Sequence, residues 1–239
     1  MTGKLLNIKS RKGFEIKNTT QTTAEIIIYS DIGESWWSDS VSAKSFSDQL
    51  NALPATVNEI TVRLNSPGGD VFDGVAIYNR LKQHKAKVIV YIDGLAASIA
   101  SIIALAGDEI IMSEGALMMI HKPWTFTYGN SLELEETINR LDDVEEQLIG
   151  IYQRKTKLDR SEIRQMLAAE TWFNADQAVE KGFATKKMAE EERVDMAASL
   201  TKASWIRNKP QVKSLSDFAK KEVNDLRKEV EDFLARSKA

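Results

Sequence analysis

Short apolar runs recur along the first half of the chain, and several of them show almost no alternation with polar residues. These runs lie at residues 25–29, 59–64, 87–92, 109–112 and 116–120. Runs of this kind, rich in isoleucine and valine, are typical of strands that are buried on both faces. Helical patterns separate them, at residues 43–53, 72–84 and 96–106. The alternation of strand and helix predicts an α/β fold of repeated βαβ units around a mostly parallel sheet.

A longer helix follows, with Ser131 as its N-terminal cap and an end near residue 155. Its apolar residues form a single stripe, which comprises Leu134, Ile138, Leu141, Val144, Leu148 and Ile151. Two shorter helices are predicted at residues 161–168 and 175–181, and Gly182 ends the second one as a C-terminal cap. The single stripe predicts that the long helix projects from the core.

The chain divides into three segments. Residues 1–24 form an N-terminal arm, residues 25–187 form the main body, and residues 188–239 form a charged linker followed by an amphipathic helix. Apolar residues recur along this last helix at alternating steps of four and three: Ala219, Val223, Leu226, Val230 and Phe233. We expect this helix either to fold back on the body or to serve self-association or the docking of a partner.

Composition narrows the classes of function. At 239 residues and 43% hydrophobic content, the chain can bury a full core. The chain has no cysteine and only two histidines, so we expect no disulfide, no metal centre and a reducing cytoplasm. The basic N-terminus lacks the apolar stretch of a secretory signal, and the longest apolar segment, residues 95–106, is too short to span a bilayer. With a net charge of −3, neither nucleic acid nor a membrane is an expected partner.

Three predicted strand ends carry residues with catalytic chemistry. Ser98 opens an apolar helix directly after a strand, His121 follows another strand, and Pro67-Gly68-Gly69 ends a third. A nucleophilic serine needs a base within hydrogen-bond reach, and glycine lets backbone amides turn towards a developing oxyanion. The second histidine, His84, lies among lysines at a polar helix end and is the poorer base. Together these features predict a serine hydrolase.

Each of these features also has an ordinary structural explanation. A serine at a strand-to-helix junction is more often an N-cap, a single histidine after a strand is usually structural, and a Pro-Gly-Gly turn is commonly only a turn. The segment Gly94-Leu95-Ala96-Ala97-Ser98 also differs from the nucleophile elbow Gly-x-Ser-x-Gly. The residues by themselves therefore leave both a hydrolase and a structural role open.

Four segments stand out by their order and spacing, namely Asn65–Gly69, Gly94–Ser98, Met118–Pro123 and Ala178–Gly182. They resemble the signatures of the ClpP family, the proteolytic subunits of Clp protease, whose fold is shared with crotonases. The resemblance extends over residues 25–187. It implies a ClpP/crotonase-like fold in which the long helix is a protruding handle, and a serine endopeptidase that needs no cofactor.

The same resemblance implies roles for individual residues. Ser98 is the nucleophile, His121 is the general base, and the amides of Gly69 and Ile99 form the oxyanion hole. The segment after His121 pairs with an extended substrate peptide as an added strand. The substrate-binding residues implied in this way are Gly68, Lys122, Pro123, Trp124 and Thr125.

Two departures from the family pattern bear on the site. The family completes its triad with an aspartate, whereas Glu170 occupies that position here; Asp176 is an alternative acid, and a solvated surface acid is a third explanation for Glu170. The segment Trp124-Thr125-Phe126-Thr127-Tyr128 replaces a glycine-rich stretch. On a strand its three rings would share one face and line a substrate groove, form a subunit contact or pack in the core.

The pair Trp36-Trp37, the charged C-terminal extension and the divergent N-terminus resemble phage-encoded and prophage-encoded members more than the housekeeping subunit. That resemblance implies an ATP-independent protease that trims scaffold or capsid protein during phage head maturation, in the host cytoplasm and inside proheads. It also implies homo-oligomeric rings that stack through the handle. The alternatives are a housekeeping-type subunit with an AAA+ unfoldase, a catalytically degenerate assembly protein and a crotonase-like acyl-CoA enzyme.

Overall fold

The computed structural model describes residues 13–34 and 40–189, all within one unit that spans Met1–Ala189. The predictions for Trp36-Trp37, and those for the linker and helix from residue 190 onwards, lie outside the described residues. Within the described ranges, no helix is both long enough and apolar enough to cross a membrane.

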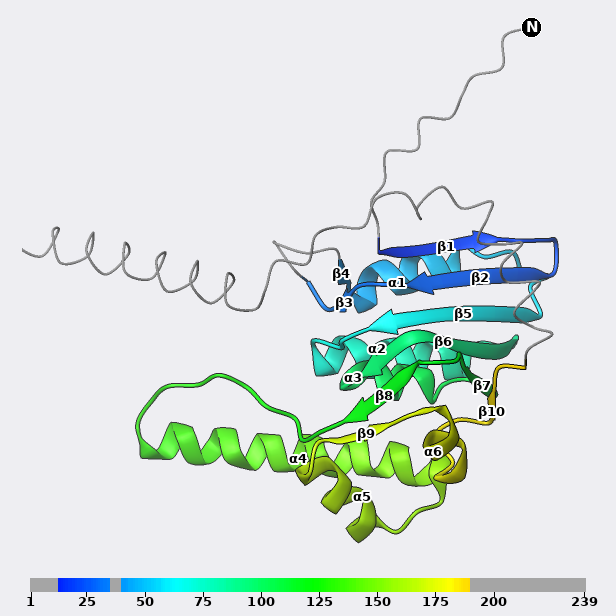
Figure 1. The fold of residues 1–239 in the computed structure, drawn as a ribbon. Coiled ribbons are helices and arrows are strands. Elements are labelled where there is room, and N and C mark those ends of the chain that lie inside the picture. The colour runs from blue at the N-terminus through cyan, green and yellow to red at the C-terminus, as the bar shows by residue number, and fades with distance from the viewer. Residues whose placement is uncertain (1–12, 35–39, 190–239) are drawn as a thin grey trace, which may run out of the picture. The chain divides into compact units, whose positions relative to one another are not determined.

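A mixed sheet runs through the unit (Figure 1). From one edge to the other its main path comprises β1 (Phe14–Asn18), β2 (Thr23–Ile28), β5 (Glu59–Ser66), β6 (Lys87–Ala97), β7 (Glu109–Met112) and β10 (Lys186–Lys187). Beyond the contact with β7, the end of β6 pairs with β8 (Leu117–Ile120), which in turn pairs with β9 (Thr171–Phe173). All neighbours from β2 to β10 are parallel, as the alternation of strand and helix predicted.

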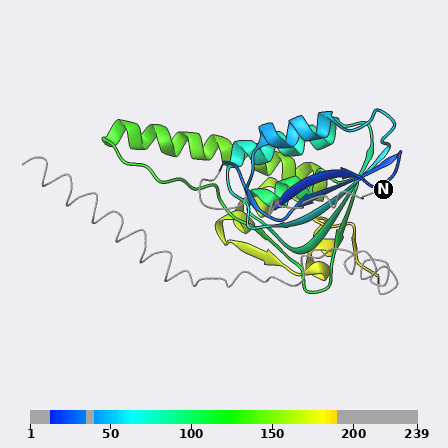
Figure 2. The same ribbon diagram turned by 90° about the horizontal axis from the view of Figure 1, so that it is seen from above.

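Three helices lie against one face of this sheet, as Figures 1 and 2 show. They are α1 (Ala43–Asn51), α2 (Val71–Gln83) and α3 (Ile99–Ala104). Buried and half-buried residues alternate along β2 and β5, and the fully buried set, which includes Ile26, Val62 and Leu64, belongs to the core. Strands buried on both faces were predicted; because the helices cover one face, the other face of these strands keeps partial exposure.

The N-terminal arm predicted over residues 1–24 contains a strand of the sheet. Phe14–Asn18 form β1, which pairs antiparallel with β2 so that Phe14 lies opposite Ile28. Phe14 is buried and its ring lies 5.7 Å from that of Phe46 on α1. The lysine-rich composition of the segment hid this strand, because only Phe14 and the half-buried Ile16 contribute apolar contacts to the core.

The third helix begins later than the sequence pattern predicted, because the strand before it is longer. A helix was expected from residue 96, but Ala96 and Ala97 are the last residues of β6 and pair with Met118 and Met119 of β8. The helix α3 begins only at Ile99. Alanine favours a helix intrinsically, but here the strands on either side supply backbone hydrogen bonds that override this propensity. Ser98 therefore lies between a strand and a helix.

The long helix α4 (Ser131–Thr156) projects away from the sheet in both views, accompanied by the loop of residues 121–130 (Figures 1 and 2). Its cap is Asn130 rather than Ser131: the Asn130 side chain accepts hydrogen bonds from the amides of Leu132 and Glu133, and the Glu133 carboxylate accepts one from the Asn130 amide. Two shorter helices, α5 (Arg160–Ala168) and α6 (Ala175–Glu180), follow it. Gly182, at φ +80°, ends α6 as predicted.

Candidate active site

Ser98 has an unusual backbone conformation at the junction of β6 and α3. Its φ of +55° and ψ of −129° lie in a region that side-chain-bearing residues rarely occupy and that is enriched at functional sites. The Ser98 amide donates a hydrogen bond to the Met119 carbonyl of β8 at 2.9 Å, which ties this turn to the neighbouring strand. The Ser98 hydroxyl makes no capping hydrogen bond to α3. The ordinary role of a serine at such a junction is therefore not the one observed.

The hydroxyl of Ser98 instead contacts His121. The distance between His121 Nε2 and Ser98 Oγ is 2.8 Å. The parallel pairing of β6 and β8 explains the contact, because residues that follow neighbouring parallel strands emerge at the same edge. His121 is half-buried directly after β8. With a proton on Nδ1, its Nε2 accepts the Ser98 hydroxyl proton.

The second histidine is not part of this site. His84 ends α2, and its Nδ1 accepts a hydrogen bond from the Ala86 amide at 3.1 Å. Burial and the charges of Lys85 and Arg80 lower the pKa of His84. His84 therefore has a local structural role at the helix end.

The Pro67-Gly68-Gly69 turn lies directly against Ser98. Gly68 has a φ of +97°, and a Cβ atom at this position would lie 2.8 Å from both Ser98 Cβ and the Ala97 carbonyl oxygen. At Gly69, with φ +145°, a Cβ would lie 2.0 Å from the Ile32 carbonyl oxygen. Only glycine lets the backbone approach so closely at these angles. The turn is thus built to place peptide groups beside the serine.

Two backbone amides next to Ser98 remain available. Among the described residues, neither the Gly69 amide nor the Ile99 amide donates a hydrogen bond to the protein. The Gly68 amide, by contrast, donates to Ser66 Oγ at 3.1 Å, and the Asp70 amide donates to the Ile32 carbonyl at 2.8 Å. Amide donors of this kind can stabilise negative charge that develops on an oxygen.

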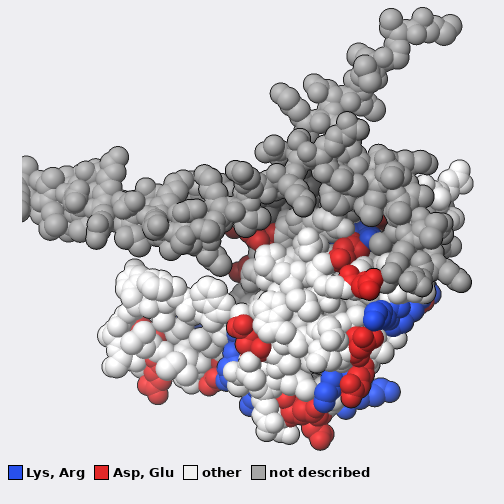
Figure 3. All heavy atoms as spheres, viewed as in Figure 1, with Lys and Arg blue, Asp and Glu red and all other residues white. Residues whose placement is uncertain are grey.

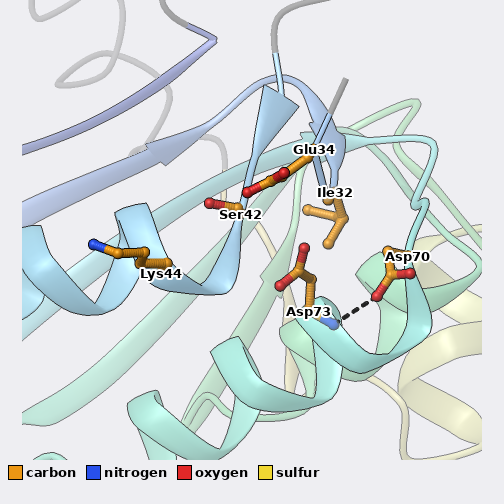
Figure 4. Close-up of a pocket in the computed structure, with 7 residues that line it drawn as sticks. Ile32, Glu34, Ser42, Lys44, Asp70 and Asp73 are labelled. Carbon is orange, nitrogen blue, oxygen red and sulfur yellow. Dashed lines mark hydrogen bonds between the residues drawn. The ribbon is translucent and has the colours of Figure 1, made fainter. Parts of the chain in front are cut away.

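Two carboxylates that follow the glycine turn, those of Asp70 and Asp73, accept hydrogen bonds from backbone amides (Figure 4). An open cavity of about 590 Å³ is lined by Ile32, Gly33, Glu34, Ser42, Lys44, Asp70 and Asp73. Asp70 caps α2 by accepting a hydrogen bond from the Asp73 amide at 2.8 Å, and Asp73 accepts one from the Ala43 amide at 3.0 Å. These contacts fix the start of α2, and with it the chain that leaves the turn.

Glu170 and His121 lie directly past the last pair of β8 and β9, and the Glu170 carboxylate contacts Trp172. β8 and β9 are antiparallel and their pairing ends with Ile120 opposite Thr171, so His121 and Glu170 are the residues just past the last pair. Glu170 is exposed, has a φ of +47°, and accepts a hydrogen bond from Trp172 Nε1 at 3.4 Å. Within the described residues, the one side-chain hydrogen bond of His121 is to Ser98. The role of Glu170 in a triad stays a prediction.

The alternative acid, Asp176, is engaged elsewhere. It lies in the first turn of α6, and its carboxylate pairs with Lys187 Nζ at 3.2 Å. That side chain is 75% exposed. Within the described residues, neither Asp176 nor Glu170 forms a hydrogen bond or an ion pair with His121.

The segment after His121 forms no regular strand. Lys122 donates its amide to the Leu167 carbonyl at 3.2 Å, and its ammonium pairs with Glu145 Oε2 of α4 at 2.8 Å. Trp124 and the two aromatic residues that follow it, Phe126 and Tyr128, are at least 75% exposed. These rings therefore do not pack in the core. On the face seen in Figure 3, the projecting part of the molecule is white above, with carboxylates along its lower edge.

Three residues of the site escaped the sequence analysis: Ser101, Glu145 and Tyr152. Ser101 Oγ donates to the Ser98 carbonyl at 2.6 Å and contacts the Tyr152 hydroxyl at 2.7 Å. Glu145 is 5% exposed. A signal for Glu145 was present, because a carboxylate that lies four residues after Leu141 and three before Leu148 falls on the apolar side of the helix.

Comparison with known proteins agrees with this fold. A structure of a ClpP1 variant from Listeria monocytogenes superposes with a TM-score of 0.60 at 22% identity, covering 72% of this chain and 94% of that one. The chain thus has a ClpP-like α/β fold, as the sequence predicted.

Sequence comparison extends the likeness. The ATP-dependent Clp protease proteolytic subunit of Deinococcus radiodurans is 28% identical over 126 residues, which is 52% of this chain and 62% of that protein. The proteolytic subunit 1 of Chlamydia muridarum is 27% identical over 157 residues, which is 62% of this chain and 81% of that protein. The family model for Clp protease matches residues 9–191. A model that matches most of the chain, together with this fold, shows that the chain belongs to the Clp protease family.

Proposed function

We propose that this protein is a serine endopeptidase of the ClpP type. The observation that carries the proposal is the 2.8 Å contact between Ser98 Oγ and His121 Nε2 beside two unused backbone amides, those of Gly69 and Ile99. A nucleophile, a base within hydrogen-bond reach and a pair of oxyanion donors are the minimal equipment for acyl transfer.

The steps follow from these groups. His121 takes the Ser98 proton as Oγ attacks the peptide carbonyl carbon, and the resulting oxyanion accepts hydrogen bonds from the Gly69 and Ile99 amides. The imidazolium then gives its proton to the leaving amine, the C–N bond breaks, and an ester to Ser98 remains. A water molecule then loses a proton to His121 as it attacks the ester carbon. The bond from that carbon to Ser98 Oγ breaks, His121 returns its proton to Oγ, and the acid product leaves.

We propose Glu170 as the acid that supports His121. Glu170 directly precedes Thr171, which pairs with Ile120, the residue before His121, and its exposed carboxylate would have to exchange its contact with Trp172 for one with Nδ1. A carboxylate there would hold the productive tautomer and stabilise the imidazolium.

The substrate in this proposal is an extended peptide. The backbone from Lys122 to Thr125 is irregular and offers an edge on which a peptide could add as a strand, and Gly68 lies directly against Ser98. The exposed Trp124 ring supplies apolar surface for a substrate side chain.

For the physiological role, we propose ATP-independent trimming of scaffold or capsid protein by a ring-forming homo-oligomer in the host cytoplasm. The support is the likeness of Trp36-Trp37 and of the C-terminal extension to phage-encoded members, both outside the described residues. The alternative is a subunit fed by an AAA+ unfoldase, and it is favoured by the ATP-dependent relatives. Co-expression with the neighbouring capsid gene product, with and without an unfoldase, separates the two by mass spectrometry of the cleavage products.

A fluorophosphonate probe tests the chemistry, because it reacts covalently with activated serines. We expect the full chain to be labelled at Ser98, and Ser98→Ala and His121→Ala to lose peptidase activity by about 10⁴-fold or more. Ser113→Ala, a buried serine away from this contact, is the matched control and should retain activity. Labelling that persists in Ser98→Ala would reject the assignment.

A further inference from the structure

Two polar side chains of α4 reach towards the two reacting residues. Glu145 and Tyr152 are seven residues apart, which is two helical turns, so they share one face of the helix. Both are buried, with exposed fractions of 5% and 2%. A buried carboxylate and a buried phenol are expensive to desolvate, and each needs a partner.

Tyr152 connects α4 to the backbone of the serine. Because Ser101 Oγ donates its proton to the Ser98 carbonyl at 2.6 Å, the Tyr152 hydroxyl is the donor in its 2.7 Å contact with Ser101 Oγ. Burial raises the pKa of Tyr152, which keeps the phenol protonated and able to donate. The hydrogen-bond chain ends on the peptide group of the residue at φ +55°, a conformation that needs outside support to persist.

Glu145 connects α4 to the histidine. Its Oε2 pairs with Lys122 Nζ at 2.8 Å, and Lys122 is covalently next to His121. The other oxygen, Oε1, makes no hydrogen bond within the described residues and lies 3.8 Å from Arg164 Nε. Since β8 ends at Ile120, the sheet does not hold His121, and the Lys122 contacts with Glu145 and Leu167 are the restraints on the chain that follows it.

We propose that Glu145 and Tyr152 are positioning residues, which hold His121 and Ser98 at reacting distance from one helix. The inference rests on the peptidase proposal and adds to it that Lys122 binds Glu145 rather than substrate through its ammonium. Misplacement of a reacting group by about 1 Å can reduce a rate by roughly 10²-fold, so small shifts at either contact matter.

Two substitutions and two matched controls in the full chain test the inference. Glu145→Gln removes the charge that holds Lys122, and Tyr152→Phe removes the hydroxyl that holds Ser101. Glu162→Gln breaks an ion pair of the same 2.8 Å length, to Lys181, away from the site. Tyr78→Phe alters another buried tyrosine, whose hydroxyl makes no hydrogen bond within the described residues.

The measurements are the rate of fluorophosphonate labelling at Ser98, kcat and KM for a peptide, and Tm. At a temperature well below the Tm of each variant, we expect each test variant to lower the labelling rate and kcat by roughly 10-fold with little change in KM. We expect the controls to match the wild type. Test variants with a lowered Tm that are labelled at the wild-type rate would overturn this inference and leave the peptidase proposal standing. A wild type that is not labelled would overturn the peptidase proposal and this inference with it.

Discussion

Two helical glycines lie in opposite environments, and the same substitution should have opposite effects on them. Gly74 lies on α2 against α3, where a Cβ atom would be 2.2 Å from Ile99 Cγ1 and 3.2 Å from both Ile99 Cβ and Cγ2. Gly150 lies on α4, where the nearest atom to a Cβ is the end of the Arg154 side chain at 3.7 Å. We therefore expect Gly74→Ala to destabilise the protein and Gly150→Ala to stabilise it.

The magnitudes follow from two terms. Alanine in place of glycine stabilises a helix interior by about 0.5–1 kcal/mol, and this is the whole effect at Gly150. At Gly74 the added methyl overpacks the core, which destabilises by about 1–3 kcal/mol. All three close atoms belong to the side chain of Ile99, which is 2% exposed and, being β-branched, has few rotamers. We expect the upper end of the range, and so a net loss of about 2 kcal/mol.

Thermal unfolding of the two variants, at one protein concentration because assembly also shifts stability, measures the difference. The gap between them of roughly 2–3 kcal/mol corresponds to roughly 5–10 °C in Tm. Fluorophosphonate labelling should also slow in Gly74→Ala, because the displaced Ile99 carries one of the proposed oxyanion amides. Equal Tm values for both variants, or a Gly74→Ala protein as stable as the wild type, would refute the close packing of α2 on α3.

Three further outcomes are expected. Glu170→Ala should lower kcat/KM by about 10–10³-fold, less than His121→Ala, while Asp176→Ala leaves it unchanged; equal losses for the two acids would remove Glu170 from the triad. Trp124→Ala should raise KM for an extended peptide with kcat retained, and an unchanged KM would place the substrate elsewhere. Hydrogen bonds from two arginines of α5 lower the pKa of Glu146, so the stability it contributes is present above its unfolded pKa and lost as pH falls through the folded one. Glu146→Gln should make stability depend less on pH over this range, as measured by an acid titration followed by circular dichroism.

The local sequence pattern was sufficient to predict those strands that bury one face in the core. The apolar runs that became β2, β5, β6 and β7 were recognisable because their core-facing residues are apolar. Pattern failed where a neighbouring strand outweighed intrinsic preference: Ala96 and Ala97 favour a helix by propensity yet end β6, and the lysine-rich segment around Phe14 joined the sheet edge.

The sequence by itself determined which groups could react. Ser98, His121 and the Gly68-Gly69 turn each follow an apolar run, and parallel strands bring such ends to one edge whatever the rest of the chain does. Only the tertiary structure decided their distance and their surroundings. The 2.8 Å contact between Ser98 and His121, and the contacts of Glu145 with Lys122 and of Tyr152 with Ser101, join residues far apart in the chain. No local pattern carries the packing that sets such distances.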